Sequence, residues 1–154
     1  MTLEDGIYII QNQREGKPSV GRDEREDKSL LPKKVITLPE GVLAPRWEVK
    51  KVDENKYRLS VRGAPTGILD DFVFAFLTDA PSEKAENWHI QEQPQHGVNI
   101  YTAEHRDVGW VVPMSGEAYQ QVAVEPLKHE PGRIIPPRYY PNEIFEFIRI
   151  DRED

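Results

Sequence analysis

The chain has 154 residues, of which 38% are hydrophobic and 31% are charged, and its formal net charge is −7 at pH 7. This length suits one domain with a core of its own, so we expect a single domain over residues 1–154. The net negative charge argues against nucleic acid and anionic membranes as partners, and no apolar run approaches the roughly 18 residues of a membrane-spanning helix.

The sequence contains no cysteine, which excludes disulfides and thiolate metal sites. Its first residues carry neither a basic segment nor an apolar run, so no secretory signal peptide is recognisable. Together these two features predict a cytoplasmic protein.

Short strands with alternating apolar and polar residues follow one another along the chain, separated by frequent prolines and glycines. They group into three units of four strands each, over residues 6–52, 55–93 and 97–151. In chain order the predicted strands are residues 6–10, 20–22, 34–38 and 46–49, then 56–60, 66–68, 72–77 and 87–90, and finally 98–102, 108–110, 121–124 and 144–147.

The three units resemble one another at two strand positions. The second strand of each unit centres on a glycine: Gly21, Gly67 and Gly109. The fourth strand of each unit carries an aromatic residue: Trp47, Trp88 and Phe145. Recurrence at spacings of 41–57 residues indicates one supersecondary unit used repeatedly.

A repeat of this size is found in propellers and in β-trefoils. Three blades are too few to close a propeller, which needs about four to eight. Twelve strands arranged as a six-stranded barrel with a cap of three hairpins satisfy the count and leave no exposed sheet edge. The sequence therefore predicts an all-β protein with the β-trefoil fold, and a closed barrel favours a monomer.

The side chains give no sign of an enzyme, a cofactor or a metal site. The four histidines have no metal-ligand spacing, and neither a phosphate-binding glycine loop nor a serine nucleophile elbow is present. Because Trp47 and Trp88 recur in register, we expect both in the core, whereas Trp110 is either packed or an exposed contact residue. A carbohydrate-binding trefoil is an alternative, although the ricin-type Gln-x-Trp signature is missing.

Two loops depart from the internal symmetry and are the natural places for function. One is the charged segment 23–33, and the other is the segment 125–142 with its five prolines. A loop stiffened by proline can offer a basic side chain to the acidic specificity pocket of a trypsin-like protease and bind as a poorly released substrate.

Each of these loops contains a lysine suited to that role. Lys28 would be the anchor in the first loop, followed by the small residue Ser29, with the two leucines after it expected to pack. The second candidate pair is Lys128 and His129. Arg25, which lies between two glutamates, and Arg22, which we assign to a strand, are less suited.

The opening segment, residues 3–12, resembles the N-termini of fungal β-trefoil protease inhibitors, in which Asp/Asn-Gly-x-Tyr leads into the first strand. Residues 20–33 are similar to the serine-protease branch of basidiomycete inhibitors, the mycospins, more than to the cysteine-protease branch, the mycocypins. The likeness extends over strand order, size and the absence of cysteine.

This resemblance implies a cytoplasmic, disulfide-free defence or regulatory protein that inhibits trypsin-like serine proteases through one surface loop. Members use either the loop between the second and third strands or the loop between the last two, which correspond to Lys28–Ser29 and Lys128–His129. A papain-like cysteine protease is the alternative target. The resemblance also leaves Asn142 as a contact for an asparagine-specific protease.

Overall fold

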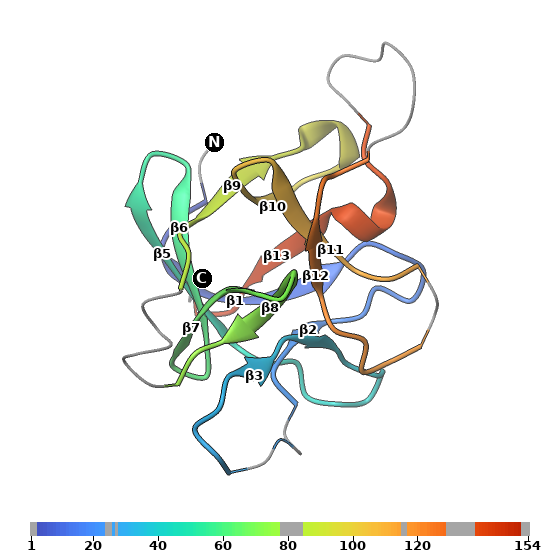
Figure 1. The fold of residues 1–154 in the computed structure, drawn as a ribbon. Helices are drawn as coiled ribbons and strands as arrows, with labels where there is room; N and C mark the ends of the chain where they lie inside the picture. Colours follow the sequence, from blue (N-terminus) through green and yellow to red (C-terminus); the bar gives the residue numbers. More distant parts are fainter. Residues whose placement is uncertain are drawn as a thin grey trace.

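The computed structural model describes residues 3–23, 26, 28–77, 85–114, 117–128 and 138–151 (Figure 1). These residues form short strands and two single turns of 3-10 helix. The strands are β1 (Gly6–Asn12), β2 (Val20–Gly21), β3 (Lys33–Lys34), β4 (Ile36–Thr37), β5 (Trp47–Asp53), β6 (Lys56–Val61), β7 (Ala64–Leu69), β8 (Phe72–Ala75), β9 (Trp88–Glu92), β10 (Ile100–His105), β11 (Val108–Val111), β12 (Ala123–Glu125) and β13 (Phe145–Arg149). The helical turns are η1 (Pro94–His96) and η2 (Pro141–Glu143).

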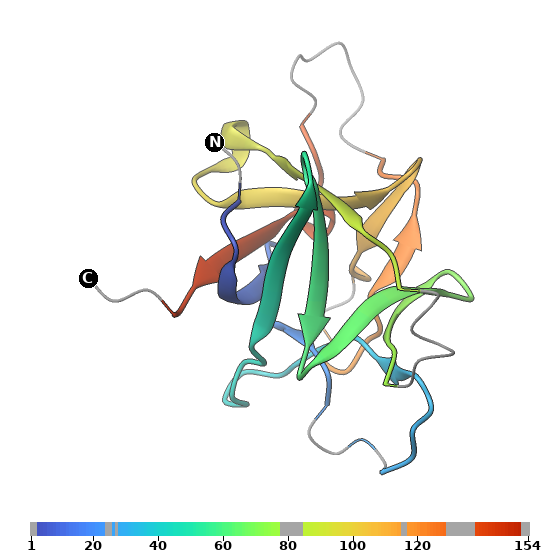
Figure 2. The same ribbon diagram turned by 90° about the vertical axis from the view of Figure 1, so that its left-hand side faces the viewer.

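Six of the strands pair into a closed ring. The ring runs β1–β5–β6–β9–β10–β13 and returns to β1, and every neighbouring pair is antiparallel. Apolar and polar residues alternate along β6, whose burial alternates from Lys56 to Leu59, so one face of the strand lines the interior. These strands form the barrel seen in Figures 1 and 2.

Three hairpins cover one end of the barrel. They are β2–β4, β7–β8 and β11–β12, and β8 also pairs with β3 and β12. The β6–β7 hairpin turns at Arg62 and Gly63 and the β7–β8 hairpin at Asp70 and Asp71, all four with positive φ, as tight hairpin turns require. The prediction of a β-trefoil is confirmed.

A ring of backbone hydrogen bonds joins the three hairpins at the pseudo-threefold axis. The N–H of Val35 donates to the carbonyl of Val73 (3.2 Å), Val73 donates to Val122 (3.0 Å), and Val122 donates to Val35 (2.9 Å). All three valines are fully buried. Each repeat therefore supplies one donor and one acceptor to the same closed set.

The centre of the core is a cluster of four aromatic rings. Trp110 lies with its ring 5.6 Å from that of Trp47, 5.3 Å from Trp88 and 5.7 Å from Phe145, measured between centroids. The last three are the symmetry-related aromatic residues of the fourth strands, and all four residues are fully buried. Trp47 and Trp88 are thus in the core as predicted, and Trp110 is packed between them.

The structure departs from the predicted strands mainly in the first repeat. The expected strand over residues 34–38 is divided into β3 and β4, because Lys33 and Lys34 pair with β8 whereas Ile36 and Thr37 pair with β2. The helical turns η1 and η2 have no counterpart among the predicted elements. Among the described residues, no helix has the length and hydrophobicity needed to span a membrane.

Candidate functional site

The start of the loop between β2 and β3 is tied to the body by an arginine. Arg22 is buried, and its guanidinium donates to the carboxylate of Glu26 and to the carbonyls of Val61 and Arg62, each at 3.3 Å. Glu26 also lies 3.6 Å from the guanidinium of Arg62. Because Arg22 is enclosed and fully engaged, it supports the loop and is not available as a protease anchor.

The end of the same loop is tied by a lysine. The ammonium of Lys33, a buried residue, donates to the hydroxyl of Ser29 at 3.3 Å, and the backbone N–H of Leu31 lies 3.4 Å from the same oxygen. Lys33 itself pairs with Ala75 in β8. Ser29 is half-buried and held in place by this contact, whereas we predicted only that it is a small residue after the scissile bond.

Three side chains that the structure describes in this loop, those of Lys28, Leu30 and Leu31, are exposed to solvent. Lys28 is exposed, and no ion pair involves it among the described residues. Leu30 and Leu31 are 67% and 68% exposed, so the expectation that they pack is wrong. A groove of about 340 Å³ lies beside them, with Leu31 and Tyr119 in its lining. Arg25 lies outside the described residues.

The second candidate loop is held at its base by a buried carboxylate. Glu143, in η2, accepts hydrogen bonds from the backbone N–H of Lys128 and from that of Tyr140 (3.0 Å). The N–H of Tyr139 donates to Nε2 of His96 at 2.9 Å. Burial, with Glu104 and Glu143 nearby, raises the pKa of the Tyr139 hydroxyl. The two ends of this loop are thus brought together.

The predicted residues of the second loop differ in accessibility. The side chain of Lys128 is exposed, but its N–H is engaged by Glu143. His129 lies outside the described residues. Asn142 is half-buried, and its amide donates to the carbonyl of Val112 at 3.0 Å, so its amide group is engaged in the fold. The connection from β2 to β3 and the short described segment after β12 lie at opposite ends of the molecule in Figures 1 and 2.

Three residues that tie these loops, Glu26, Lys33 and Glu143, are not among the predicted site residues. Glu26 follows Arg22 by four residues, a spacing typical of ion pairs, although here it occurs in a loop. Pro141 and Glu143 stand at the first and third positions of η2, the pattern of a helix start whose glutamate caps the backbone. This second signal was visible in the sequence.

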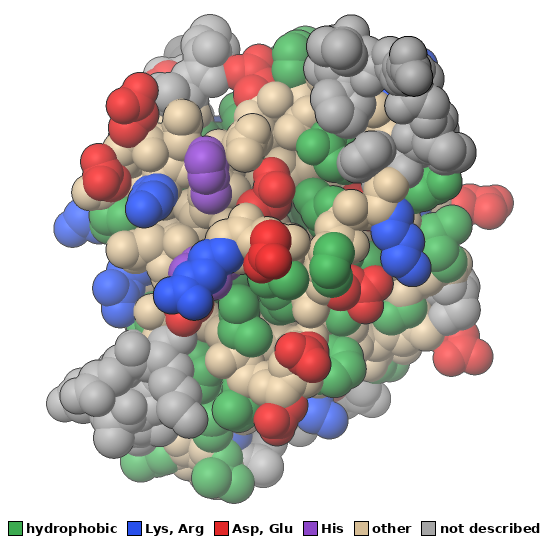
Figure 3. Space-filling view, turned by 45° about the horizontal axis from the view of Figure 1, so that its top comes forward, with side chains coloured by type: hydrophobic (Ala, Val, Ile, Leu, Met, Phe, Trp, Pro, Cys, Tyr) green, Lys and Arg blue, Asp and Glu red, His purple; other side chains and the backbone are tan. Residues whose placement is uncertain are grey.

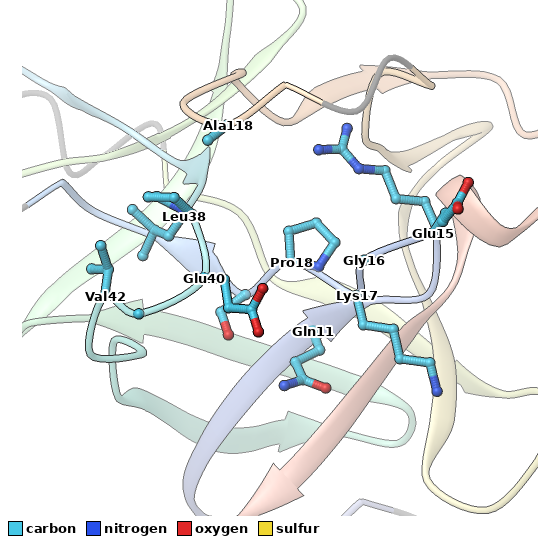
Figure 4. A pocket seen from close by; sticks show the side chains of 13 residues that line it. Gln11, Glu15, Gly16, Lys17, Pro18, Leu38, Glu40, Val42 and Ala118 are labelled. Carbon is cyan, nitrogen blue, oxygen red and sulfur yellow. The ribbon is translucent and has the colours of Figure 1, made fainter.

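A third feature is a polar hollow of about 670 Å³ between the β1–β2 connection and the start of the β4–β5 connection (Figure 4). Gln11, Lys17 and Glu40 contribute polar groups, and Pro18 and Leu38 contribute apolar ones. No aromatic side chain is among the described residues that line it. It therefore lacks the flat apolar surface on which a sugar ring stacks.

Arg14 closes the inner side of this hollow. Its buried guanidinium donates to the carbonyls of Pro113 (2.5 Å) and Glu117 (2.8 Å) and to the side chain of Gln120 (3.1 Å). Burial lowers the pKa of this guanidinium. Arg14 thus joins the β1–β2 connection to Pro113, Glu117 and Gln120, and its role is structural.

Neither the surface charge nor the histidines of the described residues indicate a further binding site. Acidic and basic side chains are interspersed over the face in Figure 3. Within the described residues, no group of three histidine or carboxylate side chains is placed to hold a metal ion. His105 pairs with Glu86 at 3.2 Å, and His96 accepts from Tyr139, so these two histidines make structural contacts.

A model of the peptidase inhibitor I66 family matches residues 1–149 of the chain. The chain belongs to this family of peptidase inhibitors. A relative described as a serine protease inhibitor, from Lentinula edodes, is 36% identical over 152 residues, which covers 97% of this chain and 100% of that protein. The predicted resemblance to basidiomycete β-trefoil inhibitors is confirmed, and these relatives are inhibitors, not enzymes.

Solved structures agree with this assignment. The proteinase inhibitor from Coprinopsis cinerea superimposes with a TM-score of 0.86 at 38% identity, covering 97% of this chain and 100% of that one. The designed threefold-symmetric protein ThreeFoil matches with a TM-score of 0.68 at 15% identity, over 95% of this chain and 100% of its own. This second likeness concerns the fold alone.

Proposed function

We propose that this I66 protein inhibits trypsin-like serine proteases in a substrate-like manner, with Lys28 in the specificity pocket and Ser29 after the scissile bond. The observation that carries the proposal is an exposed lysine on a loop tied at both ends, by Arg22 to Glu26 and by Lys33 to Ser29. The serine protease inhibitor from Lentinula edodes, a full-length relative, supports the target class.

The ties matter because they lower the cost of ordering the loop on binding. A flexible loop loses conformational entropy when a protease captures it, and a tethered loop has already lost most of it. The protease pocket then gains a desolvated lysine paired with its acidic group, and one buried anchor of this kind dominates an interface. Leu30 and Leu31 extend the exposed surface after the scissile bond.

Lys28 is favoured over Lys128 because of the backbone at each position. A protease binds such a loop as an added strand, so main-chain groups around the anchor must be able to form hydrogen bonds with the enzyme. The N–H of Lys128 donates to buried Glu143, and binding would have to break that hydrogen bond. Buried carboxylates that lose a donor are costly.

The first prediction tests this choice by titrating trypsin with the wild-type protein and two variants. Lys28→Ala should weaken inhibition by about 100-fold or more, since anchor residues contribute most of the binding energy. Lys128→Ala, a matched change of another exposed lysine, should leave inhibition within about twofold. The residual activity of trypsin against inhibitor concentration measures both effects.

Other outcomes would redirect the assignment. Loss of inhibition in Lys128→Ala alone would transfer the reactive site to the second loop. If the wild-type protein leaves trypsin untouched but inhibits papain, the target class proposed here is wrong. A glycan-array signal without any protease inhibition would instead favour the lectin alternative.

We also propose that the active species is a monomer that binds one trypsin. The barrel strands pair in a closed ring, so none of them presents a free edge to a second copy. Sedimentation of the free protein should give the mass of one chain. A stable dimer in sedimentation would contradict this.

A further inference from the structure

The connection from β4 to β5 carries the most exposed large apolar side chain among the described residues. Leu43 is 82% exposed, and Val42 beside it is 36% exposed. The chain leaves the body at buried Leu38 and returns to it at buried Trp47, so residues 39–46 form a projecting loop. Neither the I66 match nor the sequence analysis assigns it a role.

The start of this loop is fixed by two backbone hydrogen bonds. The N–H of Leu38 donates to the carbonyl of Ser19 at 2.9 Å, and the N–H of Val42 donates to that of Pro39 at 3.3 Å. The second bond closes a turn in which Gly41 has a φ of 91°, a conformation that glycine adopts without strain. Leu38, Glu40 and Val42 are seen on this turn in Figure 4.

The end of the loop is fixed by packing. Pro45 lies against Gly21 so closely that a Cβ at Gly21 would stand 2.4 Å from its Cγ. Proline also restricts the preceding residue, Ala44, to an extended backbone. Just beyond, the indole N–H of Trp47 donates to the carbonyl of Val20 at 2.9 Å. Both ends of the loop are thus tied to β2 and to the residue before it.

A lone leucine on a loop that is fixed at both ends is suited to a pocket and not to a flat protein surface. A stable protein interface buries about 800 Å² on each partner, which one projecting side chain does not provide. A specificity pocket needs only one anchor, and among serine proteases the chymotrypsin-type pocket is a hydrophobic slot, whereas the trypsin pocket carries an acidic group. The apolar side chain of Leu43 matches the hydrophobic slot of the chymotrypsin-type pocket.

We infer that residues 42–45 form a second reactive site, with Leu43 as the anchor and Leu43–Ala44 as the bond presented, for serine proteases with an apolar specificity pocket. The inference rests on the proposed substrate-like inhibition, but not on Lys28 as its anchor. The protein then has two reactive loops with different specificities on one scaffold. Trypsin is bound through Lys28, and chymotrypsin through Leu43.

The second prediction is tested by titrating chymotrypsin with the wild-type protein, Leu43→Ala and Val98→Ala. Leu43→Ala should weaken chymotrypsin inhibition by about 100-fold, the loss expected for an anchor residue, and leave trypsin inhibition unchanged. Val98 is 81% exposed and lies before β10, so Val98→Ala controls for the loss of an exposed apolar side chain and should change neither.

A gain of function provides a second readout. Leu43→Lys placed in a Lys28→Ala background should restore inhibition of trypsin, because the same backbone would then present a basic anchor. Lys28→Ala alone should leave chymotrypsin inhibition unchanged. Both results would support a second, independent site.

The outcomes separate this inference from the proposal on Lys28. If chymotrypsin is not inhibited, or Leu43→Ala inhibits it as well as the wild-type protein does, the Leu43 site is wrong while trypsin inhibition through Lys28 can still stand. If trypsin is unaffected but chymotrypsin is inhibited through Leu43, the Leu43 site is supported and the proposal on Lys28 is wrong. Self-association that depends on Leu43, without protease inhibition, would also overturn the inference.

Discussion

At the scale of single residues, the three tryptophans of the core differ in how their indole N–H groups are used. Trp47 donates to the carbonyl of Val20 at 2.9 Å, and Trp88 donates to the hydroxyl of Thr66 at 2.9 Å. The N–H of Trp110 has no hydrogen-bond partner among the described residues, where aromatic rings surround it. Trp110 therefore stabilises the fold by packing.

This difference gives the third prediction, a comparison of Trp47→Phe with Trp110→Phe. Both changes remove the same volume from a fully buried position, but only the first also leaves a carbonyl in the core without its donor. We expect Trp47→Phe to lower the free energy of unfolding by about 1–2 kcal/mol more than Trp110→Phe. Urea denaturation measures the free energy of unfolding of both variants. An equal or larger loss of this free energy in Trp110→Phe would contradict the prediction.

At the scale of elements, the two ties of the β2–β3 loop make its geometry a property of the scaffold. Arg22 joins the loop to the carbonyls at the β6–β7 turn, and Lys33 joins it to β8. The loop of the first repeat is thus positioned by elements of the second repeat. Changes in the scaffold far from Lys28 along the sequence should therefore alter the geometry of the proposed reactive bond.

The fourth prediction concerns Arg22→Ala, which leaves Lys28 in place and removes the tie at the start of the loop. The loop must then be ordered on binding, so we expect trypsin inhibition to weaken by about tenfold and the loop to be cleaved faster. Arg62→Ala removes only the more distant partner of Glu26, at 3.6 Å, and is the control. Inhibition constants and the rate of appearance of cleaved protein are measured.

If Arg22→Ala inhibits as tightly and is cleaved as slowly as the wild-type protein, the tie does not matter for binding. An equal effect of Arg62→Ala would show that the charge of Glu26, and not the hydrogen bonds of Arg22, sets the loop geometry.

The sequence predicts the elements far better than it predicts these ties. Strand positions follow from alternating apolar residues and from the recurring glycines and aromatics, which are local signals. The bonds from Arg22 to Val61 and Arg62 join residues about 40 positions apart, and no local pattern indicates them. The exposure of Leu30 and Leu31 is likewise not indicated by a local pattern. We expected these two apolar residues to pack, but the tertiary fold leaves them in solvent.

At the scale of the whole molecule, two closed sets of pairings hold the repeats together. One is the ring of six barrel strands, and the other is the set of hydrogen bonds among Val35, Val73 and Val122 at the axis. Because each repeat completes both sets, we expect the protein to unfold as a single unit.

The fifth prediction is a loss of stability at alkaline pH. Burial, together with Glu92, Tyr8 and Tyr57 nearby, raises the pKa of Tyr101 from 10.0 to about 12. A raised folded-state pKa adds stability below the unfolded value of 10.0 that is lost as pH rises through about 12. The melting temperature should fall over this window, and less steeply in Tyr101→Phe. Parallel melting curves for both proteins would contradict it.

The pairing of β1 with β13 sets when the protein can fold during its synthesis. Tyr8 lies opposite Arg149 and Asn12 opposite Phe145, so the first strand made finds this partner only when the last has been made. Until then a growing chain carries an unpaired strand edge, and pairings so distant in sequence form slowly. Closure of the barrel should therefore wait until β13 has left the ribosome, and the high charge of the chain helps keep the incomplete barrel in solution.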